Sequence, residues 1–151
     1  MRFTTRKINI FLFFKLPIAW IAGVRLYSLT EEESCAHVRF RWLNQNPFNS
    51  IYFAVQAMAA ELTTGVLVMR EIKMHHLPIS MLVIQNSAVF HKKAKGKIIF
   101  SCQDAEQLHK IVTEAVATKQ GQTLWLTSRG VDQYGDCVSE FKFLWSIKLK
   151  Q

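Results

Sequence analysis

The chain has 151 residues, of which half are hydrophobic and 12% aromatic, so it can bury a core and cannot be disordered throughout. A single domain covering 1–151 is the expectation for this length. The formal net charge of +8 favours anionic partners such as phosphorylated cofactors, nucleic acid or an acidic membrane surface, without choosing among them.

Residues 1–15 place basic side chains before the apolar run IFLFF, as a signal peptide would. Lys15 ends that run, however, and no small-residue cleavage site precedes a polar mature chain. We therefore predict an N-terminal helical extension that packs four apolar side chains onto the domain: Ile8, Phe11, Leu12 and Phe14. A peripheral membrane contact through this helix is the less favoured alternative.

Two strands are predicted next. The segment from Ala19 to Leu29 is rich in strand formers and ends at an acidic turn, Glu31–Glu33. Residues 35–42, CAHVRFRW, alternate apolar and polar side chains, which indicates a half-buried strand with one apolar face: Ala36, Val38, Phe40 and Trp42.

The central segment, about 50–69, is apolar on nearly every side, and a helix of that kind is expected to be buried. Asn49 or Ser50 is the expected N-cap, and residues 70–77 are expected to form a linker that ends at Pro78. The segment is too polar for a membrane span because Glu61, Thr63 and Thr64 interrupt it.

The remaining chain predicts four strands and one helix. The mostly apolar residues 79–90 suggest a strand covered on both faces, and Gly96 suggests a tight turn that pairs it with a strand over 97–102. Residues 104–119 have the pattern of a surface helix, with a capping box at Asp104 and a C-cap at Gly121. A final hairpin over 124–149 alternates its inward side chains: Phe141, Phe143, Trp145 and Ile147.

This order of elements, together with several short stretches, resembles the hotdog thioesterase superfamily, and within it an uncharacterised branch with an extra helix between the fourth and fifth strands. The stretches are Asn46, Ser50–Ala54, Ala60-Glu61-Leu62, Gly65 and the FHKKAKGKIIF run from Phe90 to Phe100. The resemblance implies an α+β hotdog fold: a curved, antiparallel six-stranded sheet wrapped around the central helix at about 50–69, plus an N-terminal helix and a surface helix at about 104–119.

The resemblance also implies a site. Glu61 corresponds to the acidic residue that acts as general base or nucleophile on an acyl thioester, and burial would raise its pKa toward neutrality. Asn46 and Thr64 would orient water or thioester beside it. The alternatives are a structural carboxylate, a loop-stabilising Asn and a helical Thr bonded to its own backbone. Many relatives carry His-Gly-Gly near the helix start where this chain has Tyr52-Phe53-Ala54, so backbone amides would have to polarise the thioester carbonyl.

Substrate contacts are expected from Tyr52 and Phe53, and from Lys93 and Lys95, which could hold the phosphates of coenzyme A. Lysines that merely protect a sheet edge are the alternative. The five histidines, His37, His75, His76, His91 and His109, lack ligand spacing in the sequence, so we predict no metal. Three isolated cysteines, Cys35, Cys102 and Cys137, suggest reduced buried thiols rather than disulfides or a zinc site.

The sequence therefore predicts a cytoplasmic, homodimeric acyl thioesterase, or a dimer of dimers, with coenzyme A as part of the substrate and no separate cofactor. A non-catalytic acyl-binding module is the main rival. A hotdog dehydratase would need a catalytic His on the central helix or the Asn46 loop, and neither carries one. Neither a G-x-S-x-G motif nor a nucleic-acid-binding motif is present, so a serine hydrolase and a nucleic-acid partner are disfavoured.

Overall fold

The computed structural model describes residues 3–150. It contains one six-stranded antiparallel sheet in the order β1-β2-β4-β5-β6-β3. The strands are β1 (Arg25–Leu29), β2 (Ser34–Arg39), β3 (Ile79–Phe90), β4 (Lys97–Cys102), β5 (Gln122–Val131) and β6 (Cys137–Leu149). The helices are α1 (Thr5–Lys15), α2 (Pro17–Ile21), α3 (Phe53–Met74) and α4 (Ala105–Thr118), with a short 3₁₀ turn η1 (Trp42–Asn44).

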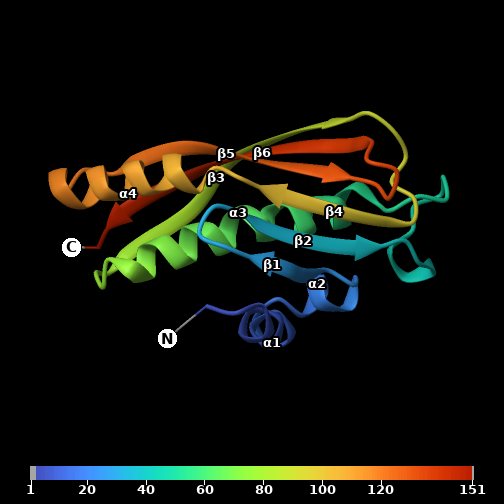
Figure 1. Ribbon diagram of the computed structural model, residues 1–151, viewed down its shortest axis with the longest axis horizontal. Coiled ribbons are helices and arrows are strands. Elements are labelled where there is room, and N and C mark those ends of the chain that lie inside the picture. The colour runs from blue at the N-terminus through green and yellow to red at the C-terminus, as the bar shows by residue number, and fades with distance from the viewer. Residues whose placement is uncertain (1–2, 151) are drawn as a thin grey trace.

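The sheet curves around α3, which runs along its concave face (Figure 1). Leu67, Val68 and Ala59 of α3 are fully buried against the inward side chains of the strands. The expectation of a curved antiparallel sheet around a long apolar helix is therefore confirmed. The helix begins at Phe53 and ends at Met74, later at both ends than the predicted 50–69.

Two expectations about the ends of α3 were wrong. Neither Asn49 nor Ser50 caps the helix, because Asn49 lies in a loop with φ of 56° and the N-cap position falls on Tyr52. The segment expected to be a linker begins as helix, and Arg70 there donates hydrogen bonds to the carbonyl oxygens of Thr30 and Glu31. These contacts give the last turns of α3 tertiary support that the local sequence does not reveal.

The final hairpin and the surface helix formed as predicted. Phe141, Phe143, Trp145 and Ile147 are all buried, and β5 pairs with β6 along almost its whole length. In the chain, α4 follows β4 and precedes β5, and it packs on α3, β5 and β6. The details of its ends differ: the Asp104 carboxylate accepts a hydrogen bond from the Thr127 amide at 2.7 Å instead of capping α4, and Lys119 rather than Gly121 takes the left-handed position.

The expected hairpin between residues 79–90 and 97–102 does not exist. β3 pairs with β6, whereas β4 lies between β2 and β5 on the other side of the sheet. The Lys92–Gly96 connection crosses between them, fixed by hydrogen bonds from the Ile51 and Phe40 amides to the carbonyls of Ala94 and Gly96. β3 is consequently an edge strand, and most of its residues are exposed instead of covered on both faces.

The segment expected to be one strand from Ala19 to Leu29 is broken. Pro17 occupies the first turn of α2, where its missing amide costs no hydrogen bond, and Gly23 at φ of 93° ends that helix before β1 begins. Similarly, β2 ends at Arg39, so Phe40 and Trp42 are not part of it, and Trp42 is 80% exposed in η1.

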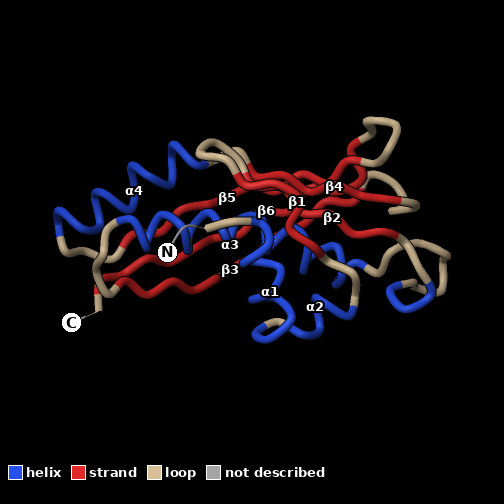
Figure 2. Tube along the Cα trace, turned by 60° about the horizontal axis from the view of Figure 1, so that its bottom comes forward, coloured by secondary structure: helices blue, strands red, loops and turns tan. Residues whose placement is uncertain are grey.

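The N-terminal helix is confirmed over Thr5–Lys15, although residues 1 and 2 of the predicted extension lie outside the described residues. Ile8 and Leu12 are buried as expected, but Phe11 and Phe14 are exposed because they lie on the outer face of α1. α1 packs beside β1, on a different side of the molecule from α4 (Figure 2). Among the described helices, none combines the length and apolar character that crossing a membrane requires.

Candidate functional site

Glu61 lies in the third turn of α3, among mostly apolar residues of that helix, and is mostly buried. Burial raises the pKa of its carboxyl group above the ordinary glutamate value. Within residues 3–150 no side chain donates a hydrogen bond to this carboxylate. A carboxylate that is neither paired nor fully hydrated holds a proton more tightly and can accept one nearer neutral pH.

Gly65, one helical turn later, leaves room for the Glu61 side chain. A Cβ atom built at Gly65 would lie 3.1 Å from Glu61 Oε1 and 3.5 Å from the ring atoms of Trp145. An alanine at this position would therefore crowd the carboxylate, while it would meet the Trp145 ring at an ordinary contact distance. Trp145 pairs in register with Val83 of β3, so Glu61 lies under the β6–β3 side of the sheet, near its exposed edge.

Thr64 is fully buried and already engaged on both sides. Its hydroxyl donates to the Glu61 carbonyl oxygen at 2.9 Å and accepts from Trp145 Nε1 at 3.0 Å. This is the backbone-bonded geometry of a helical Thr, which was the alternative to an orienting role. Thr64 thus fixes the indole over this turn of α3.

The side chain of Asn46 stabilises the loop in which it lies. Its Oδ1 accepts hydrogen bonds from the Phe48 amide at 2.9 Å and from the Ser50 amide at 3.2 Å, in the manner of an Asx turn. The Ser50 hydroxyl lies within hydrogen-bonding distance of both polar atoms of the Asn46 side chain. Asn46 therefore holds the chain that leads into α3.

A cleft of about 330 Å³ opens at the start of α3 and contains three of the predicted site residues, Asn46, Phe53 and Lys93. The first-turn amides of Phe53 and Ala54 have no acceptor within the helix and point toward its N-terminal end. The other lining residues are Phe48, Ser50, Ile51, Gln56, Phe90, His91, Lys92 and Ala94. Glu61, Thr64, Tyr52 and Lys95 do not line this cleft, so the structure brings together only part of the predicted site.

Four lysines near this cleft are close in the sequence but have different surroundings in the structure: Lys92, Lys93, Lys95 and Lys97. Lys92 Nζ is paired with Asp132 at 2.7 Å and Asp136 at 2.9 Å, and Lys97 lies over the Tyr27 ring. Lys93 and Lys95 are exposed, and Lys93 faces the cleft. Of the four lysines, Lys93 is the one placed to meet an anion there.

The described cysteines are free thiols, as predicted; Cys35 and Cys102 are buried, whereas Cys137 is partly exposed. Burial raises the pKa of the Cys102 thiol to about 12, so it stays protonated and unreactive.

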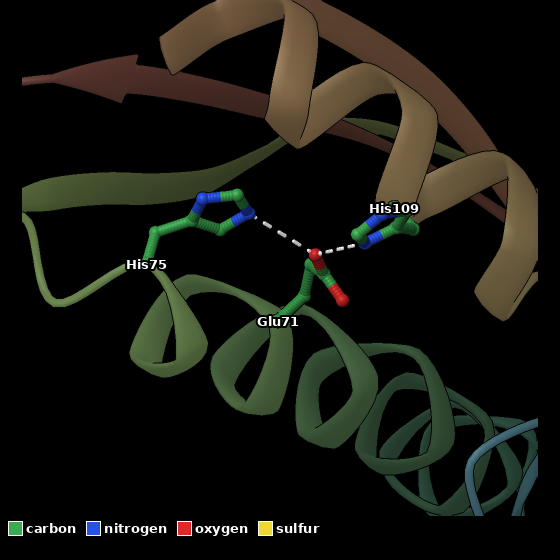
Figure 3. Close-up of side chains that lie close together, drawn as sticks. All are labelled: Glu71, His75 and His109. Atoms are coloured by element: carbon green, nitrogen blue, oxygen red, sulfur yellow. Dashed lines mark hydrogen bonds and ion pairs between the residues drawn. The ribbon is translucent and has the colours of Figure 1, made fainter.

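A second group of polar side chains lies at the other end of α3 and was missed from the sequence. Glu71 Oε1 lies 3.2 Å from His75 Nε2 and 2.8 Å from His109 Nδ1 (Figure 3). The Glu-x-x-x-His spacing of Glu71 and His75 places both on one helical face and could have been noticed. His109 could not, because it joins from α4, 38 residues further along the chain.

The fold is the hotdog fold, and solved structures with this architecture include proteins described as thioesterases. The chain is similar to PA5026 of Pseudomonas aeruginosa, a protein of unknown function described as a "Probable Thioesterase", with 22% identity, a TM-score of 0.83 and coverage of 99% of both chains. It is similar to the Haemophilus influenzae thioesterase HI1161, with 10% identity, a TM-score of 0.69 and coverage of 99% and 93% of the two chains. A mutant form of the P. aeruginosa thioesterase PA1618 matches with 9% identity, a TM-score of 0.72 and coverage of 99% and 97%.

The chain belongs to the family described as "Domain of unknown function (DUF4442)", whose model matches residues 4–147. The expected hotdog fold, with an extra helix between the fourth and fifth strands, is confirmed, and the family that matches is itself described as of unknown function. No curated protein matches the sequence significantly.

Proposed function

We propose that this protein is a cytoplasmic hydrolase of acyl thioesters of the coenzyme A type. The observation that carries the proposal is the Glu61 carboxylate: it lies on the central helix, has a pKa raised by burial, and packs against Gly65, where a side chain would crowd it. In the proposed reaction, Glu61 removes a proton from water, and the resulting hydroxide attacks the thioester carbonyl carbon. The C–S bond then breaks, and the proton held by Glu61 passes to the leaving thiolate, which restores the carboxylate. Direct attack by the carboxylate, giving an anhydride that water hydrolyses, is the other form of the same proposal.

The start of α3 would supply the electrophilic side of the site. Amides in the first turn of a helix carry partial positive charge and can stabilise the oxyanion of a tetrahedral intermediate. Phe53 and Lys93 line the adjacent cleft and would contact the substrate's acyl or pantetheine chain and its phosphates, respectively. Tyr52 and Lys95, which are exposed beside this cleft, would act farther from the reacting carbonyl.

Dimerisation through β3 would bring the separated parts of the site closer. β5 and β6, the strands of the final hairpin, are both interior strands and offer no free edge. β3 is the long edge instead, and Leu82, Ile84 and Val89 on it are each more than half exposed. An apolar edge of this kind favours pairing with another strand, and two copies of β3 would do so about a two-fold axis near Glu61.

Sedimentation at micromolar concentration tests this assembly. We expect a dimer or a dimer of dimers in the native protein, and dissociation when Ile84→Lys places a charge on the edge. A native protein that sediments as a folded monomer contradicts the proposed assembly.

A non-catalytic acyl-binding module is the second candidate, and two observations favour it. The side chains of Asn46 and Thr64 are engaged in structural hydrogen bonds, and Glu61 does not line the cleft at the helix start. A module of this kind would bind acyl thioesters in the apolar interior without cleaving them.

A screen of short, long and aromatic acyl-CoAs distinguishes the two candidates. Thiol release by the wild-type protein supports the hydrolase. Saturable binding of an acyl-CoA without thiol release supports the binding module and refutes the hydrolase.

A further inference from the structure

The contact between α3 and α4 contains a group of side chains that the proposed hydrolysis does not use. Glu71 is buried in the last turn of α3, His75 follows at its C-terminal cap, and His109 approaches from α4. Figure 3 shows both imidazole rings directed at one carboxylate oxygen, Glu71 Oε1. Glu71 and His75 meet because positions i and i+4 share a helical face, whereas His109 meets them only through tertiary packing.

The three side chains offer a convergent set of donor atoms. One oxygen and two nitrogens all lie within 4.8 Å of one another. Zinc bound tetrahedrally at about 2.0–2.1 Å from nitrogen and oxygen donors needs them about 3.3 Å apart. The two oxygen–nitrogen separations, 3.2 and 2.8 Å, are shorter than that spacing by about 0.1 and 0.5 Å.

We propose that Glu71, His75 and His109 form a binding site for a divalent transition-metal ion of the zinc class. The ligand atoms are a Glu71 carboxylate oxygen, His75 Nε2 and His109 Nδ1, with water completing the coordination. Imidazole and carboxylate are donors that Zn²⁺ and its neighbours in the first transition row accept, whereas Mg²⁺ and Ca²⁺ prefer all-oxygen sites. The ion would tie α4 to the C-terminal end of α3.

The ligands can adjust to an ion without rebuilding the fold. Glu71 is held by the body of α3 and its side chain is only 7% exposed, so it serves as the fixed ligand. His75 Nε2 and His109 Nδ1 must come closer together to bind one ion. The His109 side chain is 58% exposed, so its ring can rotate toward His75. In the metal-free protein the same carboxylate oxygen instead accepts hydrogen bonds from the two rings.

The surroundings favour a cation although the chain as a whole is basic. A cleft of about 700 Å³ gives solvent access to Glu71 and His109, and three further carboxylates line it: Glu31, Glu32 and Glu106. Arg70, which also lines it, donates to the backbone carbonyls of Thr30 and Glu31. Glu106 is paired with Lys110 at 2.7 Å, and the charge of Arg70 offsets part of that of Glu31 and Glu71, so the remaining carboxylates leave the cleft a modest excess of negative charge.

Calorimetric titration of ZnCl₂ into chelator-treated protein without a histidine tag tests the site. We expect saturable binding of one ion per chain. In His75→Ala and His109→Ala the affinity should fall at least about tenfold, the lower range for disturbing a metal site. His76→Ala is the matched control, because His76 adjoins His75 in the sequence but is absent from the cluster, and it should bind as the wild type does.

Glu71→Gln separates metal ligation from hydrogen bonding. The amide oxygen can still accept hydrogen bonds from both rings, but the neutral amide is a poor zinc ligand, so binding should weaken while the apoprotein stays folded. Zn²⁺ should also raise the melting temperature of the wild type and of His76→Ala but not of His109→Ala, because only a ligand that binds the native state stabilises it. The proposal is overturned if the wild type shows no saturable binding, or if the three ligand variants, His75→Ala, His109→Ala and Glu71→Gln, bind Zn²⁺ as tightly as the wild type.

Discussion

Replacement of Gly65 by alanine should stabilise the protein while displacing the Glu61 carboxylate. Glycine inside a helix costs roughly 0.8–1.0 kcal/mol relative to alanine, and Gly65 lies in the middle of α3. The new Cβ would meet Glu61 Oε1 at 3.1 Å, which is a few tenths of an ångström too close, and Trp145 at an ordinary 3.5 Å. The Glu61 side chain has no hydrogen-bond partner among the described residues, so it can rotate away at small cost. The net gain should be about 0.5–1 kcal/mol.

Gly130→Ala is the matched contrast, because its glycine meets a rigid neighbour. A Cβ at Gly130 would lie 2.5 Å from Cε1 of Phe100, a ring that is completely buried. Overpacking of this kind typically costs about 1–3 kcal/mol. Urea unfolding of both variants should therefore give opposite signs. If Gly65→Ala is destabilised as much as Gly130→Ala, then the Glu61 side chain is not free to move, and the description of an unpaired carboxylate is wrong.

Three further predictions concern the core and its titration. Thr63→Val should cost about 1–3 kcal/mol, because it leaves the buried Ser128 hydroxyl without its 2.8 Å partner; an unfolding free energy equal to wild type would contradict this. Met58→Asp should unfold the protein or lower its melting temperature sharply, because Met58 packs against the core. Glu114→Lys should change the melting temperature little, because Glu114 is exposed. Equal melting temperatures for the two variants would contradict the burial of the central helix. Because burial raises the folded-state pKa of Glu61, the native state binds its proton more tightly than the unfolded state does. Wild-type stability should thus fall relative to Glu61→Gln as pH rises from the unfolded to the folded pKa, and parallel pH profiles would refute that shift.

The elements that the sequence predicted well are those whose signal is local. The alternation of Phe141, Phe143 and Trp145 specifies one buried face, and a helix that is apolar on every side has few places to lie other than beneath a sheet. The burial of Glu61 was predictable for the same reason, because the residue belongs to such a helix. The extra helix α4 was equally visible from its apolar stripe.

The failures concern contacts between distant segments. Gly96 does adopt positive φ, at 68°, as a tight turn requires, but the turn leads β4 away from β3 rather than back along it. The true partner of β3 is β6, and no local pattern specifies which of several apolar strands a given strand will pair with. The Glu71–His75–His109 group was missed for the same reason, since His109 has no sequence relation to the other two. The roles of Asn46 and Thr64 also depended on partners, Ser50 and Trp145, that only the folded chain reveals.

The most direct test of the proposed hydrolase is the rate of acyl-CoA hydrolysis by Glu61→Gln. Glutamine preserves the size of the side chain but cannot take a proton from water, so turnover should fall by about 10²–10⁴ while acyl-CoA binding and the oligomeric state are retained. Glu114→Gln is the control, because it removes an exposed carboxylate on α4, and it should hydrolyse acyl-CoA as fast as the wild type does. The wild-type rate should rise with pH along a titration displaced above the ordinary glutamate pKa, because burial raises the pKa of Glu61. Full hydrolysis by a well-folded Glu61→Gln protein would contradict the assignment of Glu61 as the catalytic group.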